Sequence, residues 1–263
     1  MSQPAHQPAT GARPTGATTE VAAAQNIQQM FSAIAPTYDR ANHLLSAGID
    51  RLWWRRAART LRPILERPEA VVLDLCCGTG DMTLALDRHR PKPLLTTHNS
   101  QLTTVSPILA VDFSHPMLSL GAQKFAGRNI LPIEADALHL PIASNSIDLI
   151  TAAFGFRNLA SYPDGLAELH RVLRPSGQIA ILECNQPTGL TGALYNLYFK
   201  RILPVLGGLI SRNPAAYAYL PASVARFPRP PRMIELIAAA GFVSPTWTPY
   251  TFGVAGLYRA TKP

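Results

Sequence analysis

The stretch Val71–Asp81, with the sequence VVLDLCCGTGD, decides the fold of this chain. Its first five residues are four large apolar side chains and one aspartate, which is typical of a strand buried in a parallel sheet. The segment Gly78-Thr79-Gly80 then predicts a tight turn into a helix, because glycine has no Cβ and tolerates positive φ angles. The stretch therefore predicts a strand–turn–helix unit of the kind at which open α/β sheets bind their ligands.

Apolar segments further along the chain predict four more strands. Between them lie segments of helical character, among them a helix capped by Ser114 and one over residues 163–173. Because strands alternate with helices, the sequence predicts an α/β fold with a doubly wound parallel sheet. The four further strands are expected over residues 108–112, 129–134, 146–154 and 178–183.

Three segments lie outside this alternation. Residues 1–22 have almost no large apolar side chain, so they predict a disordered tail. Residues 23–66 predict N-terminal helices, since Ile27 and Met30 begin an apolar pattern at helical spacing. Residues 88–106 are polar and lengthen the link between the first two strands, which predicts a surface insertion.

The charge of the chain is sparse but strongly unbalanced. Of its 263 residues only 15% are charged, yet 24 Lys and Arg against 16 Asp and Glu give a formal net charge of +8. Much of the excess lies in an arginine-rich segment at residues 51–67 and in residues 184–234, which contain no acid. Such a balance fits a partner that is negative, apolar, or both.

Several classes of protein are not indicated. No run of 18 apolar residues predicts a membrane-spanning helix, and no secretory signal is expected at the N-terminus. The three cysteines form no disulfide framework, which favours a reducing, cytoplasmic compartment. The histidines lack metal-ligand spacing, so no metal site is predicted.

Acidic residues follow the predicted strands where a ligand would bind. Asp112 ends the second strand, where a carboxylate can accept hydrogen bonds from both hydroxyls of a ribose. Asp136 and Ala137 follow the third strand and are expected beside an adenine edge. An aspartate next to the glycine turn disfavours phosphate and suits an amino group or a sulfonium. An alternative is that Asp74 only caps a turn, and that Gly78 and Gly80 serve only the corner.

Together these residues resemble the cofactor site of class I S-adenosylmethionine-dependent methyltransferases. Further motifs resemble the C-methyltransferases of menaquinone and ubiquinone biosynthesis, over roughly residues 26–260. The resemblance implies that Thr79, Asp112, Asp136 and Ala137 contact the cofactor, with Asp74, Gly78 and Gly80 around it. The motifs are FSAIAPTYDRAN at residues 31–42, LSAG at 45–48, WWR at 53–55, FGFRN at 154–158 and RVLRP at 171–175.

The chain departs from the family pattern at two places. Ala153 stands where a serine often precedes the FGFRN motif, so only a backbone contact to the cofactor is expected there. The residues after the fifth strand read LECNQP where the family has LEFSKP, which puts a role for that Ser-Lys pair in doubt.

The resemblance implies a Rossmann-like domain over residues 23–263, with a mostly parallel seven-stranded sheet covered by helices on both faces. Helical additions at residues 23–66 and 184–235 would form the substrate side. The implied reaction is C-methylation of a polyprenyl demethylmenaquinol. Alternatives are a polyprenyl benzoquinol of ubiquinone synthesis, or another small-molecule or tRNA substrate.

Carbon methylation requires a phenolate, because deprotonation of the hydroxyl makes the neighbouring ring carbon nucleophilic. Arg157 is the candidate that stabilises this phenolate, either directly or through a water, since a guanidinium rarely loses its proton. Tyr38 and Asn158 are the candidates that orient the ring. The alternative for Arg157 is an ion pair with a carboxylate that holds its loop.

The basic segments leave two kinds of partner open. Residues 194–210 are apolar with two central cations and are expected to line a channel for a polyprenyl tail or to lie at the surface of a cytoplasmic membrane. A core helix is the alternative for this stretch. Nucleic acid is disfavoured because no RNA-recognition motif is present. A homo-oligomer is left open.

Overall fold

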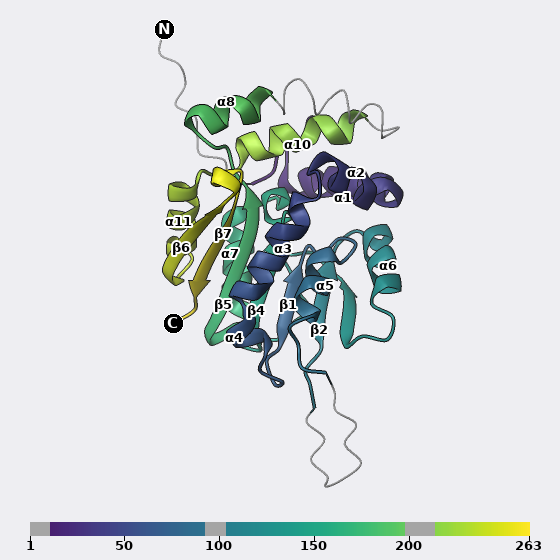
Figure 1. Cartoon of the computed structure of the whole chain (residues 1–263), viewed down its shortest axis with the longest axis vertical. Coiled ribbons are helices and arrows are strands. Elements are labelled where there is room, and N and C mark those ends of the chain that lie inside the picture. The colour runs from purple at the N-terminus through teal and green to yellow at the C-terminus, as the bar shows by residue number, and fades with distance from the viewer. Residues whose placement is uncertain (1–10, 93–103, 198–213) are drawn as a thin grey trace.

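The computed structural model describes residues 11–92, 104–197 and 214–263. Its centre is a seven-stranded sheet with the strand order β3-β2-β1-β4-β5-β7-β6 (Figure 1). The strands β3, β2, β1, β4 and β5 are parallel, and β7 runs antiparallel to both β5 and β6. The mostly parallel α/β fold predicted from the sequence is therefore confirmed. The strands are β1 Val72–Leu75, β2 Ile108–Asp112, β3 Ile130–Glu134, β4 Ile147–Ala153, β5 Leu173–Cys184, β6 Val243–Tyr250 and β7 Ala255–Thr261.

Both faces of the sheet are covered because its central strands are apolar on both sides. In β1, Leu73 and Leu75 pack toward the helices α7 (Tyr162–Val172) and α11 (Pro230–Ala239). Val72 packs on the opposite face with α3 (Ile49–Thr60), α4 (Arg62–Leu65), α5 (Asp81–Asp87) and α6 (His115–Lys124). Residues two apart share a face in a strand, so these two clusters follow directly from the run at residues 71–75.

The remaining helices lie across the carboxyl edge of the sheet, at the top of Figure 1. Reversal of the strand order beside β1 makes this edge the place where ligands bind in open α/β sheets. The helices are α1 Glu20–Ile34, α2 Tyr38–Leu45, α8 Gly189–Leu197 and α10 Pro214–Arg226. Among the described residues, no helix is long and apolar enough to cross a membrane.

Gly11 and Ala12, which belong to the stretch predicted as a disordered tail, pack against the domain in the structure. The amide of Ala12 donates to the carbonyl of Leu159 at 2.8 Å, and Ala12 is buried. A Cβ on Gly11 would lie 1.8 Å from the carbonyl oxygen of Ala160, so the lack of a side chain allows this close approach. Gly11 and Ala12 therefore contact the folded domain, whereas most of residues 15–22 are exposed.

The ends of the polar insertion at residues 88–106 are fixed by one arginine. The Arg90 guanidinium is buried and donates to the carbonyl oxygens of five residues between 2.8 and 3.1 Å. The middle of the insertion, residues 93–103, lies outside the described residues. The five acceptors are Leu65, Arg67, Pro68, Ala70 and Ser106.

Two boundaries on the substrate side differ from the sequence prediction. Residues 230–239 form α11, whose Met233 and Ile237 are buried in the core against the sheet, so the addition after β5 ends before residue 230. The strand β5 begins at Leu173 and continues through Gly177, where a helix end was expected. Residues 198–213, which include most of the apolar stretch at 194–210, lie outside the described part of the chain.

Candidate active site

The glycine turn after β1 forms an open cradle. Gly78 has a φ of 56°, and no atom lies within 4 Å of the place where a Cβ would stand. Gly80 has a φ of 87°, and a Cβ there would lie 2.3 Å from the ring of Phe125. Only glycine satisfies both positions without strain. The turn therefore exposes backbone on the side of Gly78 and packs tightly under α6 on the side of Gly80.

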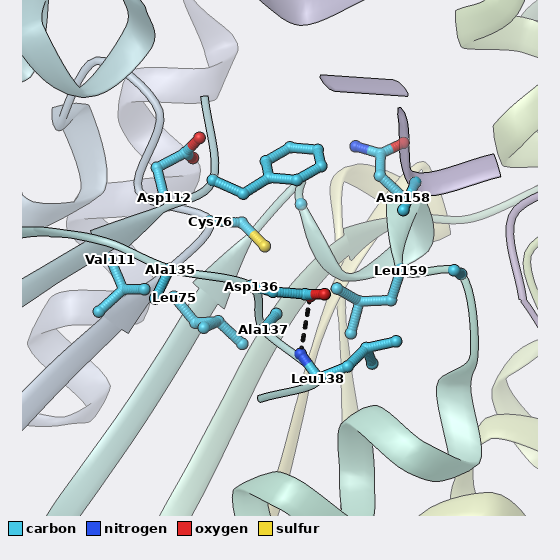
Figure 2. A pocket seen from close by; sticks show the side chains of 14 residues that line it. Leu75, Cys76, Val111, Asp112, Ala135, Asp136, Ala137, Leu138, Asn158 and Leu159 are labelled. Atoms are coloured by element: carbon cyan, nitrogen blue, oxygen red, sulfur yellow. Dashed lines mark hydrogen bonds between the residues drawn. The ribbon is translucent and has the colours of Figure 1, made fainter. Parts of the chain in front are cut away.

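A small cavity of about 30 Å³ opens beside this turn, between the ends of β1, β2 and β3 (Figure 2). Asp112 at the end of β2 lines it together with Asp136 and Ala137. The carboxylate of Asp136 accepts a hydrogen bond from the amide of Leu138 at 2.9 Å, which orients it (Figure 2). The structure thus brings together the three residues expected around the nucleoside of the cofactor.

Asp112 is held rigidly by the backbone around it. Its two oxygens accept hydrogen bonds from the amides of Gly78 at 2.8 Å and Ser114 at 2.9 Å. Burial raises the pKa of Asp112 to about 6, although these hydrogen bonds act to lower it. Each oxygen keeps a second lone pair, so the carboxylate can still accept hydroxyl groups from a ligand.

Asp74 lies at the base of the glycine turn, among the residues that border the ligand space there. Its side chain is fully buried, and its oxygens accept hydrogen bonds from the hydroxyls of Thr83 and Thr151, both at 2.6 Å. Burial raises its pKa to about 6, against the lowering effect of these two hydroxyls. The carboxylate therefore joins β1 to α5 and β4 and supports the glycine turn from within.

A second, much larger cavity of about 600 Å³ adjoins the glycine turn and extends under the N-terminal helices. Aromatic side chains dominate its wall, and Trp53 lies 5.7 Å from Phe154 between ring centroids. The size and apolar character are typical of a site for a mostly apolar small molecule. Its aromatic lining consists of Phe31, Tyr38, Trp53, Trp54, Phe154, Tyr195 and Tyr219.

Arg157 lines this large cavity from the short helix Phe156–Asn158. Its Nη1 donates to the buried carboxylate of Glu183 at 2.8 Å, and its Nε donates to the hydroxyl of Ser223 at 3.3 Å. Nη2 has no hydrogen-bond partner within the described residues. The ion pair considered from the sequence is present, and one edge of the guanidinium remains for a ligand.

Burial and mutual attraction shift the pKa values of both members of the Arg157–Glu183 pair. Burial raises the pKa of Glu183 to about 7, against the lowering effect of the neighbouring guanidinium. Burial would lower the pKa of Arg157, but the Glu183 carboxylate outweighs it and raises that pKa above its usual value. The guanidinium therefore stays charged at the wall of the cavity.

The two other predicted catalytic residues lie in different places. Tyr38 on α2 lines the large cavity, and burial raises its pKa to about 12 even though the charge of Arg157 acts to lower it. Asn158 instead lines the small cavity, where Figure 2 shows it opposite Asp112. Its side-chain oxygen accepts a hydrogen bond from Tyr219 at 3.0 Å. Only Arg157 and Tyr38 thus share the large cavity.

Sequence reasoning missed residues that act through long-range contacts. Glu183 was seen only as part of a motif, and Asp39 and Lys124 were not considered as site residues at all. Asp39 accepts a hydrogen bond from the hydroxyl of Thr79 at 2.5 Å and an ion pair from Lys124 at 2.7 Å. An acidic residue directly after Tyr38 was the signal in the sequence that could have pointed to Asp39. Its partners could not be predicted, because they are 40 and 85 residues away.

All three cysteines line the ligand space. Cys77 and Cys184 line the large cavity, and Cys76 lines both cavities. Burial raises the pKa of Cys184 to about 12, and burial together with the charge of Asp112 raises that of Cys76 well above its usual value. Both groups are therefore thiols at neutral pH.

The arrangement fits S-adenosylmethionine. The Gly78 cradle leaves room for close approach of a ligand to the backbone, and Asp112 offers oriented acceptors for ribose hydroxyls. No group of three or more His, Cys, Asp or Glu side chains within the described ranges could hold a metal ion.

Comparison with known proteins identifies the family of this chain. Residues 19–262 match the model of the ubiE/COQ5 methyltransferase family. The chain is 43% identical to the demethylmenaquinone methyltransferase of Deinococcus radiodurans, over 90% of this chain and 93% of that protein. It is also 43% identical to the demethylmenaquinone methyltransferase of Thermus thermophilus, over 89% of this chain and all of that protein. The ubiquinone/menaquinone biosynthesis C-methyltransferase of Geobacter sulfurreducens is 39% identical, over 90% of this chain and 89% of that protein.

Solved structures support the fold. A SAM-dependent methyltransferase of Thermotoga maritima matches with a TM-score of 0.63 at 16% identity, over 90% of this chain and all of that chain. Because the family model covers nearly the whole chain, and the fold and cofactor site agree with it, this protein is an S-adenosylmethionine-dependent methyltransferase that belongs to the ubiE/COQ5 family.

Proposed function

We propose that this chain methylates a ring carbon of a polyprenyl demethylmenaquinol, with S-adenosylmethionine as the methyl donor. The observation that carries the proposal is the position of Arg157, whose charged guanidinium lies in the wall of an apolar, aromatic cavity next to the cofactor turn. The names of the two relatives at 43% identity support a naphthoquinol over a benzoquinol.

The cavity supplies the environment that the reaction needs. The cofactor, when bound, supplies an electrophilic methyl group on its sulfonium. Nη2 of Arg157 is available to donate a hydrogen bond to the developing phenolate oxygen of the quinol, where a fixed positive charge in an apolar site is most effective. Tyr38 borders the same cavity and orients the ring, while Asn158 acts from the cofactor side. Holding the ring carbon in line with the methyl group supplies much of the remaining rate enhancement.

The proposal is tested with purified protein, labelled S-adenosylmethionine and chemically reduced quinones under anaerobic conditions. We expect labelled methyl transfer to the ring of a demethylnaphthoquinol, and accumulation of demethylmenaquinone in a host that lacks the protein. Transfer only to a polyprenyl benzoquinol would instead assign the ubiquinone route. Transfer to tRNA, or an unchanged quinone pool in the host, would contradict the proposal.

We further propose that the protein meets its lipid-tailed substrate at an anionic membrane surface through α3. The exposed side of α3 presents Arg51, Arg55 and Arg59 at intervals of four residues, and none of them has an ion pair within the described residues. Leu52, exposed by 60%, lies on the same helix. Arginines and exposed apolar side chains on one face are typical of helices that bind at a lipid interface.

Helix α3 also forms part of the wall of the large cavity. Trp53 lines the cavity and donates a hydrogen bond to the hydroxyl of Thr251 at 2.8 Å, which joins α3 to the short helix Thr251–Gly253. Phe252 in that short helix is 87% exposed. A membrane that contacts Leu52 and Phe252 would therefore lie where a polyprenyl tail leaves the cavity.

Reversal of two α3 charges is expected to weaken vesicle binding. Because each arginine near an anionic surface contributes about 1 kcal/mol, Arg55→Glu with Arg59→Glu should lower affinity for phosphatidylglycerol vesicles about 30-fold. The control is Arg229→Glu with Arg232→Glu, which changes the net charge equally near the start of α11 and should have little effect. Flotation assays measure both. Equal loss in the two variants, or binding to tRNA but not to vesicles, would contradict this surface.

A further inference from the structure

The N-terminal helices are attached to the cofactor turn through a compact set of charged side chains. One carboxylate oxygen of Asp39 on α2 accepts a hydrogen bond from the Thr79 hydroxyl at 2.5 Å. The other oxygen accepts one from the Lys124 ammonium at 2.7 Å. Lys124, at the end of α6, also donates to Asp81 at 3.1 Å. These four side chains belong to three segments far apart in the sequence, so Asp39 attaches α2 to the glycine turn. His43 of the same helix lies 3.6 Å from Asp81 and is a second, longer contact there.

The same helix carries part of the wall of the large cavity. Tyr38 and Asn42 on α2 line that cavity, and Tyr38 is the immediate neighbour of Asp39. The glycine turn, which Asp39 contacts through Thr79, also lines this cavity. Movement of Asp39 away from Thr79 would therefore displace the wall against which the substrate ring packs.

Helix α1 has anchors of its own. Gln28 donates to the carbonyl of Phe113 at 2.6 Å, and Ser32 shares a hydrogen bond of 3.0 Å with Ser114. These contacts do not involve Asp39. On α2, His43 still contacts Asp50 at 2.8 Å when Asp39 is replaced. Loss of the Asp39 contacts should thus loosen the start of α2 while α1 stays in place.

We propose that Asp39 is a positioning residue that couples the cofactor turn to the substrate cavity, by holding Tyr38 and Asn42 of α2 in place through Thr79 and Lys124. This inference rests on the proposed function for the identity of the substrate. Asp39 does not act on the reacting atoms. The wall of the quinol site is complete only when α2 packs against the glycine turn. The contacts of Asp39 hold α2 in that position.

The coupling predicts a separation of kinetic constants. Asp39→Ala should raise KM for a demethylnaphthoquinol about tenfold, since a charge-assisted hydrogen bond and an ion pair are lost, and should change the Kd of S-adenosylhomocysteine less than threefold. Asp39→Asn keeps an acceptor for Thr79 and should restore part of the loss. Lys124→Met combined with Asp39→Ala should add to Asp39→Ala only the loss of the Lys124–Asp81 contact, because both substitutions remove the Asp39–Lys124 ion pair.

Amide hydrogen exchange tests the coupling without any substrate. In Asp39→Ala, residues 38–45 should exchange about tenfold faster than in the wild type, while α1 exchanges at the wild-type rate. The control is Asp87→Ala, which removes a carboxylate paired with Arg128 at 2.7 Å away from both cavities and should alter neither exchange nor KM.

The outcomes are distinct. A parallel loss of S-adenosylhomocysteine affinity and quinol KM would make Asp39 a direct cofactor ligand and overturn the proposal, as would unchanged exchange over residues 38–45. If the wild type methylates no quinol, the proposed function fails, but the exchange measurement still decides whether Asp39 holds α2.

Discussion

Arg157→Ala is expected to lower kcat for quinol methylation by about a hundredfold to a thousandfold, the range seen when a group that stabilises a developing oxyanion is removed. The Kd of S-adenosylhomocysteine should stay within threefold of wild type, because Arg157 lines the large cavity and not the small one around Asp112. Single-turnover kinetics and calorimetry measure the two quantities. Unchanged turnover would remove Arg157 from the reaction.

The buried partner of Arg157 requires a control for folding. Removing one member of a buried ion pair costs about 3–5 kcal/mol of stability, because the other charge is left uncompensated. The folded-state pKa of Glu183 is already raised to about 7 by burial, and loss of the arginine raises it further. Since a raised carboxyl pKa makes the folded state bind the proton more tightly, Arg157→Ala should be less stable at pH 8 than at pH 6.

A double variant separates the structural role of Arg157 from its catalytic role. Arg157→Ala with Glu183→Gln removes both charges, so we expect thermal stability to recover relative to Arg157→Ala. Activity should remain low, because no cation faces the cavity. Recovery of activity together with stability would show that Arg157 serves only to hold its loop.

Asp112→Ala is expected to weaken S-adenosylhomocysteine binding about a hundredfold, because it removes the acceptor for two ribose hydroxyls and also leaves the amides of Gly78 and Ser114 without their partner. Calorimetry gives the Kd directly. The same aspartate should make binding depend on pH. Because its pKa is raised to about 6 by burial, affinity should fall as the pH decreases through 6 and one acceptor site is protonated.

The loss of affinity in acid is distinguishable from unfolding. A folded-state pKa above the unfolded value means that this group makes the fold more stable, not less, as the pH falls from 7 to 5. Asp74 titrates in the same range, since burial raises its pKa to about 6 as well. Asp112→Asn should therefore bind more weakly than wild type at pH 7 but lose most of the dependence below it. An Asp112→Asn protein that keeps the wild-type dependence would assign it to Asp74 or another group.

The fold followed from local patterns in the sequence. Alternate side chains of the run at residues 71–75 pack into the hydrophobic clusters on the two faces of the sheet. The glycines after the run have the positive φ angles that the turn requires. The three residues around the small cavity follow strand ends directly, so the position of each strand end places them. These are features in which residues close in sequence decide the structure.

The missed features depend on contacts between distant segments. Asp39 becomes informative only when α2 lies over Thr79, and Glu183 only when β5 places it beside Arg157. The contact of Gly11 and Ala12 with the domain was not predicted, because such small residues give no apolar pattern in the sequence. Asn158 was expected to face the ring, but the short helix that carries Arg157 directs the adjacent side chain to the other cavity.

The cysteines that line the ligand space have a consequence for the oxidised form of a quinone substrate. Quinones are electrophiles that form covalent adducts with thiolates, and the thiolate rather than the thiol is the reactive species. Burial keeps Cys184 and Cys76 protonated at neutral pH. An oxidised quinone in the cavity would therefore meet thiols rather than thiolates, which disfavours arylation of these side chains.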